Sequence, residues 1–360
     1  MFNIPPALRY PKYRAYWIGA LASVGGYQTL IFGQGWLTFE LTGSPLYLGY
    51  IGLASATSSI ALNLFGGVFA DKLDKRRLIV ITQLTTASLI FLLALITLLE
   101  VVQVWHIILI AFVAGGVGAF DQPAQQALYP HLIDRNAIVS AVALDSAVWQ
   151  GMRIVAPAAA GLVISLAGTA TAFFLASAGF VTMASVMLLL KVPRIEPASG
   201  GNPIHDMIEG LKFIGGSAVF SFLIGMTFFN SFFGMAYMMM MPAFAVDILK
   251  VGADSQGLLM GMSGLGSLAI TMVMSSMSGS ANRGPLIVAG SAVFGLSIAT
   301  FALTSLYAGS VPLALALMLV VGISSSMYMI SIRSSLQLLT PDSMRAVSYT
   351  HLTLPTKRMV

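Results

Sequence analysis

Residues 67–77 read GVFADKLDKRR and lie between two long apolar runs. Six of the seven residues from Asp71 to Arg77 carry a charge, although charged residues make up only 9% of the chain. Between two membrane-spanning segments, a cluster of this density is stable only where it lies in water. Loops rich in lysine and arginine face the cytoplasm. The stretch therefore predicts a chain that crosses a membrane repeatedly, with this loop on the cytoplasmic side.

The composition of the whole chain excludes a soluble globular protein. Of its 360 residues, 57% are hydrophobic, and the mean hydropathy is +0.88, whereas soluble domains carry roughly a quarter charged residues. The chain has no cysteine, and its four histidines show no ligand spacing. No phosphate-binding loop is present, so ATP-driven transport is not supported. We expect no metal, no cofactor and no nucleic-acid partner, and we interpret the net charge of +5 as a topology signal.

The apolar runs are long enough to be membrane-spanning helices. A spanning helix needs about 20 mostly apolar residues, and helices satisfy their backbone hydrogen bonds within one segment. The sequence predicts ten of them, at about 15–39, 46–70, 78–99, 104–121, 142–167, 170–190, 217–240, 255–277, 285–305 and 311–333. The expected fold class is therefore an all-α integral membrane bundle.

Basic residues alternate between the predicted loops. They precede the first helix and follow the second, fourth, sixth, eighth and tenth helices, whereas the remaining loops hold only Lys250. This distribution predicts a cytoplasmic N-terminus in a multi-pass protein of the lipid bilayer.

The chain divides into two halves around a polar interruption. We predict a six-helix half at 1–190, a cytoplasmic linker with an amphipathic helix at 191–216, and a half with four helices at 217–346. The polar text at 347–360 has no helical periodicity. It resembles a reading frame that runs into adapter sequence, so we expect a truncated chain with an artefactual tail; a natural polar terminus is the alternative.

Four motifs, in order, carry a resemblance to a known family. The pattern Gly-x-x-x-Asp-Arg/Lys-x-Gly-Arg-Arg matches at 67–76 with Asp74 in place of the second glycine, and further matches lie at 120–128, 153–161 and 242–249. The chain resembles the major facilitator superfamily, in the branch of bacterial exporters that includes the enterobactin exporter. The resemblance implies twelve helices in two pseudo-symmetric halves, of which about ten are present, in a monomer of the bacterial inner membrane.

The charged loop has a predicted function as a cytoplasmic gate. We expect the glycine to allow close helix approach and Asp71 to face the positive end of another helix. We also expect Arg76 or Arg77 to reach Asp121. In the family such contacts hold the two halves together; the alternative is that the charges only fix the topology. The predicted gate residues are Gly67, Asp71, Lys72, Lys75, Arg76, Arg77 and Asp121.

One predicted helix carries a charged stripe inside the membrane. Asp145, Trp149 and Arg153 are spaced i, i+4 and i+8, so they share one face, with Arg153 about 12 Å deeper than Asp145. A buried arginine needs a cavity or a partner. Arg153 therefore either binds an anionic or polar substrate or couples to a proton, or it is a structural residue hydrogen-bonded to carbonyl groups or to the helix at 104–121.

Further residues on this helix and its neighbours complete the candidate site. Pro157 and Gly161 predict a bend packed closely against the glycine-rich helix at 255–277. Uncharged polar residues at membrane depth need partners or water, and we take Gln28, Gln34 and Asn230 as ligand candidates, with interhelical hydrogen bonds as the alternative. Methionines 238–241 form either a soft cavity wall or a lipid-facing surface.

We therefore predict a secondary transporter that exports a small organic molecule, such as a drug-like compound, a siderophore or another metabolite, by alternating access. No carboxylate lies clearly at mid-membrane, so proton coupling is implied by the resemblance alone. An importer or facilitator of the same fold and a truncated fragment that cannot cycle are the alternatives. A membrane enzyme is not expected, because no catalytic cluster lies at one depth.

Overall fold

The computed structural model describes residues 5–190, 216, 218–229, 234, 236–276 and 283–339 of the chain. For residues 64–72, 220, 275, 276, 283, 333 and 336–339 the description covers the backbone alone.

Six long helices form the first part of the bundle. They are α1 (Pro11–Thr42), α2 (Pro45–Lys72), α3 (Lys75–Leu98), α4 (Val104–Leu128), α5 (Ile138–Ala167) and α6 (Thr169–Leu189). Short 3₁₀ helices precede α1 (Pro6–Arg9) and join α4 to α5 (Tyr129–Leu132 and Arg135–Ala137). Five of them agree with the predicted helices within four residues at each end, whereas α4 continues seven residues past its predicted end at residue 121.

The second part contains α8 (Ala218–Phe229), α9 (Ala236–Ala243), α10 (Ala253–Ser276), α11 (Arg283–Ala308) and α12 (Val311–Leu339). The helix predicted at 217–240 corresponds to α8 and α9, and the residues between them lie largely outside the description. Its predicted end at residue 240 is wrong. A π-helical turn, Phe244–Ile248, follows α9 directly, because Pro242 lacks an amide donor and the backbone continues with wider hydrogen-bonded turns.

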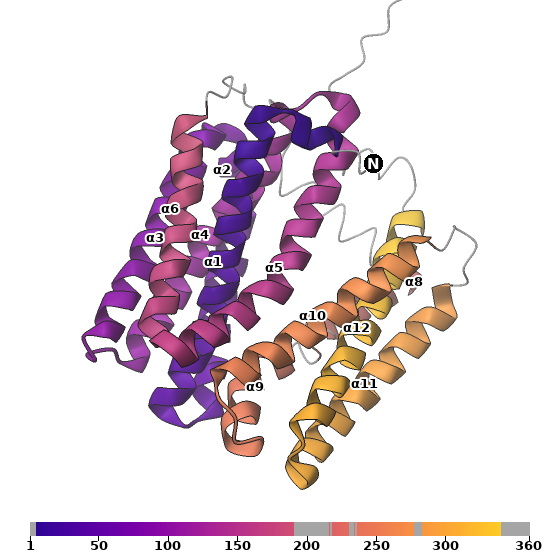
Figure 1. Ribbon diagram of the computed structural model, residues 1–360. Coiled ribbons are helices and arrows are strands. Elements are labelled where there is room, and N and C mark those ends of the chain that lie inside the picture. Colours follow the sequence, from indigo (N-terminus) through magenta and orange to yellow (C-terminus); the bar gives the residue numbers. More distant parts are fainter. Residues whose placement is uncertain are drawn as a thin grey trace, which may run out of the picture.

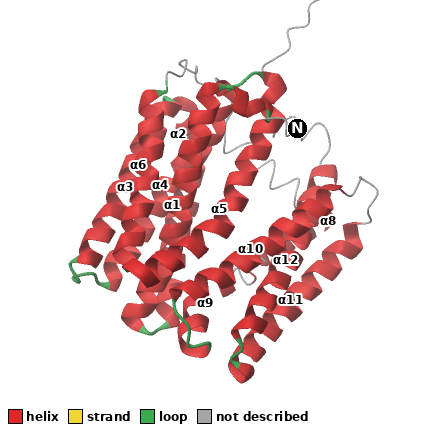
Figure 2. Ribbon diagram, viewed as in Figure 1, coloured by secondary structure: helices red, strands yellow, loops and turns green. Residues whose placement is uncertain are grey.

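Every described secondary-structure element is a helix (Figure 2). Within the described part of the chain, seven helical segments have the length and hydropathy of membrane spans: Lys75–Leu98, Val104–Leu132, Arg135–Ala167, Thr169–Leu189, Ala253–Met274, Gly284–Ala308 and Val311–Ile332. The expected all-α membrane bundle is therefore confirmed.

Asp74, which replaces the second glycine of the family motif, lies at the start of a helix. Asp74 is the N-cap of α3, and its carboxylate accepts hydrogen bonds from the backbone amides of Arg76 at 3.0 Å and Arg77 at 3.2 Å. Aspartate is among the preferred N-cap residues because its side chain pairs with otherwise unbonded amides. The α2–α3 turn therefore marks one end of the bundle, which we call the charged end.

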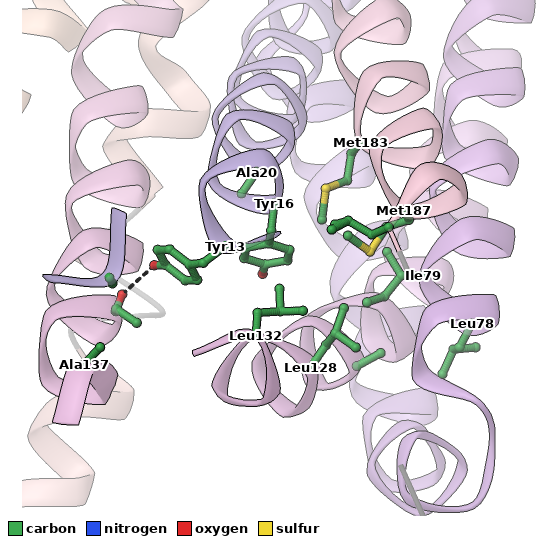
Figure 3. Close-up of a cluster of buried hydrophobic side chains, with 14 residues drawn as sticks. Tyr13, Tyr16, Ala20, Leu78, Ile79, Leu128, Leu132, Ala137, Met183 and Met187 are labelled. Atoms are coloured by element: carbon green, nitrogen blue, oxygen red, sulfur yellow. Dashed lines mark hydrogen bonds between the residues drawn. The ribbon is translucent and has the colours of Figure 1, made fainter. Parts of the chain in front are cut away.

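A buried cluster stabilises the charged end (Figure 3). Tyr13 is 1% exposed and donates its hydroxyl to the carbonyl of Ala141 at 3.0 Å. Met183 and Met187 from α6 pack in the same cluster, together with Leu128 from the end of α4. The cluster joins five helices of the first part, α1, α3, α4, α5 and α6, into one unit.

The two parts of the bundle meet mainly through α5 and α10, which lie side by side away from the charged end and diverge toward it (Figure 1). A Cβ atom on Gly161 would overlap the carbonyl group of Ala253, and one on Gly257 would lie 2.5 Å from the carbonyl oxygen of Pro157. The helices thus touch backbone to backbone, which the glycines alone permit. The predicted close packing of Gly161 against the glycine-rich helix is confirmed.

Apolar side chains continue this contact toward the opposite end. Phe32 of α1 and Ala160 of α5 are buried with Ala253 of α10, and Phe39 and Leu48 pack with Ala243 of α9. The first and second parts are therefore joined at the end remote from the charged loop.

We predict that Gly161→Ala destabilises the protein by about 1–3 kcal/mol, because the added methyl group forces α5 and α10 apart. The matched control is Gly151→Ala on the same helix, where a Cβ would meet no heavy atom within 4 Å. Thermal unfolding of the purified protein in detergent measures both. Equal unfolding temperatures for the two variants would contradict a backbone contact at Gly161.

Candidate functional site

Three adjoining cavities lie in the interior. The first, which we call the acidic cavity, has a volume of about 200 Å³ and lies among all six helices of the first part, α1 to α6. Its polar lining comprises Tyr16, Ser23, Tyr27, Gln34, Ser55, Ser59, Asn63, Thr86, Asp121, Gln122, Gln125, Gln126, Asp145 and Trp149. A polar lining of this extent at membrane depth suits water or a polar ligand rather than lipid.

The other two cavities lie between the two parts of the bundle. A cavity of about 330 Å³, which we call the methionine cavity, is lined by α1 and α2 on one side and by Met238, Met239, Gln256 and Met260 on the other. It shares Gln34 and three further lining residues with the acidic cavity. The third space, the arginine pocket, measures about 10 Å³ and shares Met238 and Met260 with the methionine cavity.

Asp121 of α4 is held by neutral donors. Its carboxylate accepts hydrogen bonds from Thr82 at 2.5 Å, Gln83 at 3.0 Å and Gln125 at 2.7 Å. The carbonyl oxygen of the Gln125 side chain in turn accepts from Tyr16 at 3.3 Å. Three charge-assisted hydrogen bonds stabilise a carboxylate that lies away from bulk water.

Asp145 lines the same cavity from α5, without such a set of donors. Among the described residues, none donates a hydrogen bond to its carboxylate. One turn further, Trp149 packs against Tyr27 with the ring centroids 6.0 Å apart and the rings nearly perpendicular. The acidic cavity thus offers one hydrogen-bonded carboxylate, one carboxylate without donors and an aromatic pair.

Arg153 lies one further turn along α5 and faces the second part of the bundle. Its guanidinium donates from Nη2 to the sulfur of Met238 at 3.4 Å, and it lines the arginine pocket with Tyr237 and Ser263. Within the described chain, no carboxylate lies within ion-pairing distance of it. The stripe of Asp145, Trp149 and Arg153 therefore lines the interior cavities, and no carbonyl group of a described residue accepts a hydrogen bond from Arg153.

The uncharged polar residues at membrane depth lie in different places, and only some of them line a cavity. Gln34 is 5% exposed and lines both large cavities. Gln28 lies on the same helix but lines none of the three cavities, whereas Asn63 lines the acidic cavity and donates to Ser59 at 3.4 Å. Asn230 lies outside the described residues. Met238 and Met239 line the methionine cavity, which supports the cavity-wall interpretation of that run.

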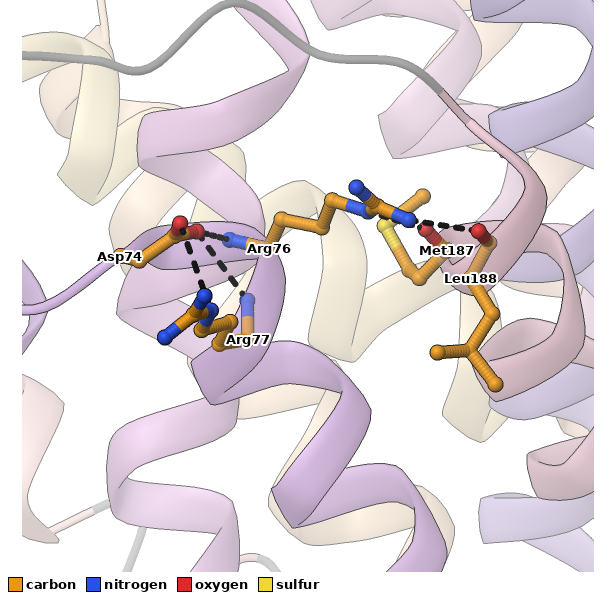
Figure 4. A network of polar contacts seen from close by, with 5 residues as sticks. All are labelled: Asp74, Arg76, Arg77, Met187 and Leu188. Carbon is orange, nitrogen blue, oxygen red and sulfur yellow. Dashed lines mark hydrogen bonds and ion pairs between the residues drawn. The ribbon is translucent and has the colours of Figure 1, made fainter.

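The charged loop makes contacts other than those expected (Figure 4). Arg76 donates from Nε to the carbonyl of Met187 at 2.7 Å and from Nη2 to that of Leu188 at 2.5 Å. Arg77 instead lies 4.0 Å from the carboxylate of Asp74. The predicted contact of Arg76 or Arg77 with Asp121 is therefore wrong for this conformation. Arg76 instead binds carbonyl groups at the end of α6, which have no partner further along that helix. The donors to Asp121 come from α3 and α4.

Of the other gate residues, Lys75 is buried at the first position of α3. The side chains of Gly67, Asp71 and Lys72 lie outside the described part of the chain. Their predicted role in closing the cytoplasmic side stays a prediction.

Several lining residues were not identified from the sequence. Gln122, Gln125 and Gln126 form a polar end of α4, and Gln256 and Met260 extend the site across to α10. The glutamines lie within the 120–128 motif, so their clustering was a usable signal. Gln256 lies beside a glycine-rich helix face, and no pattern in the sequence indicates which way it points.

Solved structures place this arrangement in a known class. The nucleoside transporter NupG superposes with a TM-score of 0.71 at 15% identity, covering 94% of this chain and 85% of that chain. A bacterial homologue of the human lysosomal transporter Spinster, in an inward-facing and unoccupied conformation, gives 0.70 at 13% identity, covering 94% and 78%. The fold is that of the major facilitator transporters.

The chain belongs to the transmembrane secretion effector family, whose profile it matches over residues 5–354. The staphyloferrin A transporter of Staphylococcus aureus (strain NCTC 8325 / PS 47) is 27% identical over 250 residues, which is 67% of this chain and 61% of that protein. The enterobactin exporter EntS of Escherichia coli O9:H4 (strain HS) is 24% identical over 278 residues, 75% and 62% respectively. The chain thus spans a little over 60% of the length of these relatives. Family and relatives are transporters, not enzymes, and a multi-pass membrane protein is confirmed.

We predict that Arg76→Ala lowers the free energy of unfolding by about 1 kcal/mol, because two hydrogen bonds from a charged donor to the end of α6 are lost and the site is partly solvated. Arg77→Ala is the matched control, since its side chain is 85% exposed and its one ion pair is at the distance limit. Thermal unfolding at two salt concentrations measures both. A larger loss for Arg77→Ala would contradict the assignment of Arg76 as the residue that holds α3 to α6.

Proposed function

We propose that this protein is a secondary active transporter that exports a small organic molecule across the bacterial inner membrane by alternating access. The observation that carries the proposal is the methionine cavity, which lies between two helical groups that contact each other away from the charged end and adjoins the acidic cavity inside the first group. A rocking motion about the α5–α10 contact would expose these cavities to one side of the membrane and then to the other. Membership of a transporter family supports this mechanism.

The proposed substrate is a siderophore or a similar metabolite with at least one anionic group. Two relatives are named as a transporter of staphyloferrin A and an exporter of enterobactin. Arg153 supports the anionic group, because a guanidinium without a carboxylate partner at membrane depth is stabilised by an anion. The thioether wall of the methionine cavity adapts its shape to bulky substrates.

Protons are the proposed coupling ion, and Asp145 is the proposed titrating group. It lines the acidic cavity and accepts no hydrogen bond from a described residue, so its protonation state can change without breaking a network. Asp121 is less suited, because its protonation would disturb a network of three hydrogen bonds to its carboxylate.

The proposed orientation places the charged end and the N-terminus in the cytoplasm, as the distribution of basic residues favours. The two halves diverge toward that end, so this conformation would accept substrate from the cytoplasm. An importer or facilitator with the same fold remains the second candidate, and a monomer is the proposed state.

We predict that proteoliposomes containing the 360-residue chain accumulate enterobactin or staphyloferrin A faster than protein-free vesicles when the interior is acidic. Antiport allows protons leaving the vesicle to drive substrate inward. Asp145→Asn is expected to abolish the acceleration by the pH gradient and to retain slow downhill exchange, because it removes the titrating group alone. Rapid filtration with labelled siderophore measures the flux.

The control is Asp134→Asn, which changes a carboxylate outside the cavities whose described partner is the hydroxyl of Tyr10 at 2.8 Å. Flux that is independent of the gradient would favour the facilitator, and no flux in either direction would favour the non-cycling fragment. A gradient effect that persists in Asp145→Asn would refute this residue as the coupling site.

We further predict that Arg153→Gln weakens binding of the anionic siderophore by roughly tenfold or more, because one charge-assisted contact is lost. Arg135→Gln, at the charged end before α5, changes the net charge equally and should leave the affinity unchanged. Equilibrium binding to the purified protein measures both variants.

A further inference from the structure

Two buried glutamines line the methionine cavity, and each has one enclosed polar atom without a hydrogen-bond partner among the described residues. Gln34 of α1 is 5% exposed and Gln256 of α10 is 2% exposed, and both line this cavity. Within the described chain, neither the Nε2 of Gln34 nor the Oε1 of Gln256 has a hydrogen-bond partner. A buried polar group without a partner is unfavourable by about 1–3 kcal/mol, so two in one cavity need an explanation.

The two unpaired atoms are chemically complementary to a single ligand group. Gln34 presents a donor and needs an acceptor, whereas Gln256 presents an acceptor and needs a donor. A carboxamide carries both in one plane. If either glutamine amide is rotated by half a turn, its donor and acceptor exchange, and a carboxamide still satisfies it. A ketone, an ether or an ester offers acceptors only.

The other side chains that line the methionine cavity determine which kind of molecule could carry the carboxamide. Met238, Met239 and Met260 line the cavity with thioethers, and Pro242 adds an apolar ring. No charged side chain of the described chain lines this cavity. The cavity therefore suits a neutral group on an apolar or aromatic body, while the charges of the site lie in the neighbouring acidic cavity and at Arg153.

We propose that Gln34 and Gln256 form a carboxamide-binding subsite for the transported molecule, bridging the two halves of the protein. This inference rests on the proposed transport function for its biological role, and binding itself does not require transport. Because one glutamine belongs to each half, a bound carboxamide links α1 to α10 and stabilises the conformation in which both reach it.

Benzamide and acetophenone test the subsite as probes of nearly the same shape, since an amino group in one replaces a methyl group in the other. We expect benzamide to bind the purified full chain in lipid nanodiscs roughly tenfold more tightly than acetophenone, because only the carboxamide pairs with both glutamines. Titrations followed by saturation-transfer difference NMR give the two dissociation constants. Equal constants for the two probes would overturn the proposal.

Gln256→Met and Gln34→Met are the test variants, because methionine matches the volume of glutamine and the thioether lining. Each is expected to reduce the preference for benzamide to below threefold. Gln150→Met is the matched control, on α5 and outside the three cavities, and should leave the preference at tenfold. If both test variants still prefer benzamide over acetophenone by tenfold, the carboxamide of the probe binds elsewhere, and the assignment of Gln34 and Gln256 is overturned.

The unliganded stability gives a second, independent readout. Replacing an unpaired buried polar group by an apolar one is neutral or stabilising, so Gln34→Met/Gln256→Met is expected to unfold at the same temperature as the unchanged protein or higher. A clear decrease would show that structural water or protein groups already satisfy the two amides, and would count against the subsite. If vesicles show no flux but the benzamide preference is present, the transport proposal fails and the subsite stands.

Discussion

The backbone contact between α5 and α10 is the constraint on which the arrangement of this protein depends. Gly161 and Gly257 allow each helix to approach the other's carbonyl groups, and bulkier residues at these positions would separate the two halves. Buried apolar clusters extend the contact to α1, α2 and α9 at the end away from the charged loop. The methionine cavity and the arginine pocket therefore lie between two groups of helices that contact each other chiefly along one line, the geometry that a rocking motion requires.

The polar groups of the interior divide into satisfied and unsatisfied sets. Asp121 has three donors and Arg76 has two carbonyl acceptors, so both stabilise the fold of the first half. Arg153 and Gln256 have no such partners among the described residues and face cavities. Native proteins rarely leave buried polar groups unpaired without a functional reason, so the second set distinguishes the candidate site from the structural networks around it.

The sequence was sufficient to predict what depends on local pattern. The helices follow from apolar length, and the stripe of Asp145, Trp149 and Arg153 follows from the helical repeat. The partner of Arg76 could not be predicted, because Met187 lies 111 residues away in the chain and its free carbonyl matters only once α6 ends beside α3. Gln256 was not predicted as a site residue. Its helix packs against neighbours on several sides, so the direction of each side chain depends on tertiary contacts. The π-turn after Pro242 likewise needed the structure.

Two side chains of the methionine cavity, Met238 and Met239 on α9, lie outside the cluster around the glycine contact, whereas Met260 on α10 packs against that cluster. Methionine has three rotatable bonds and adapts to ligands of different shape, whereas the glycine contact tolerates almost no change in volume. Substitutions at Met238 and Met239 can therefore change the shape of the cavity with little effect on the contact between α5 and α10. The lining of the cavity is thus free to vary while the packing that joins the two halves is kept.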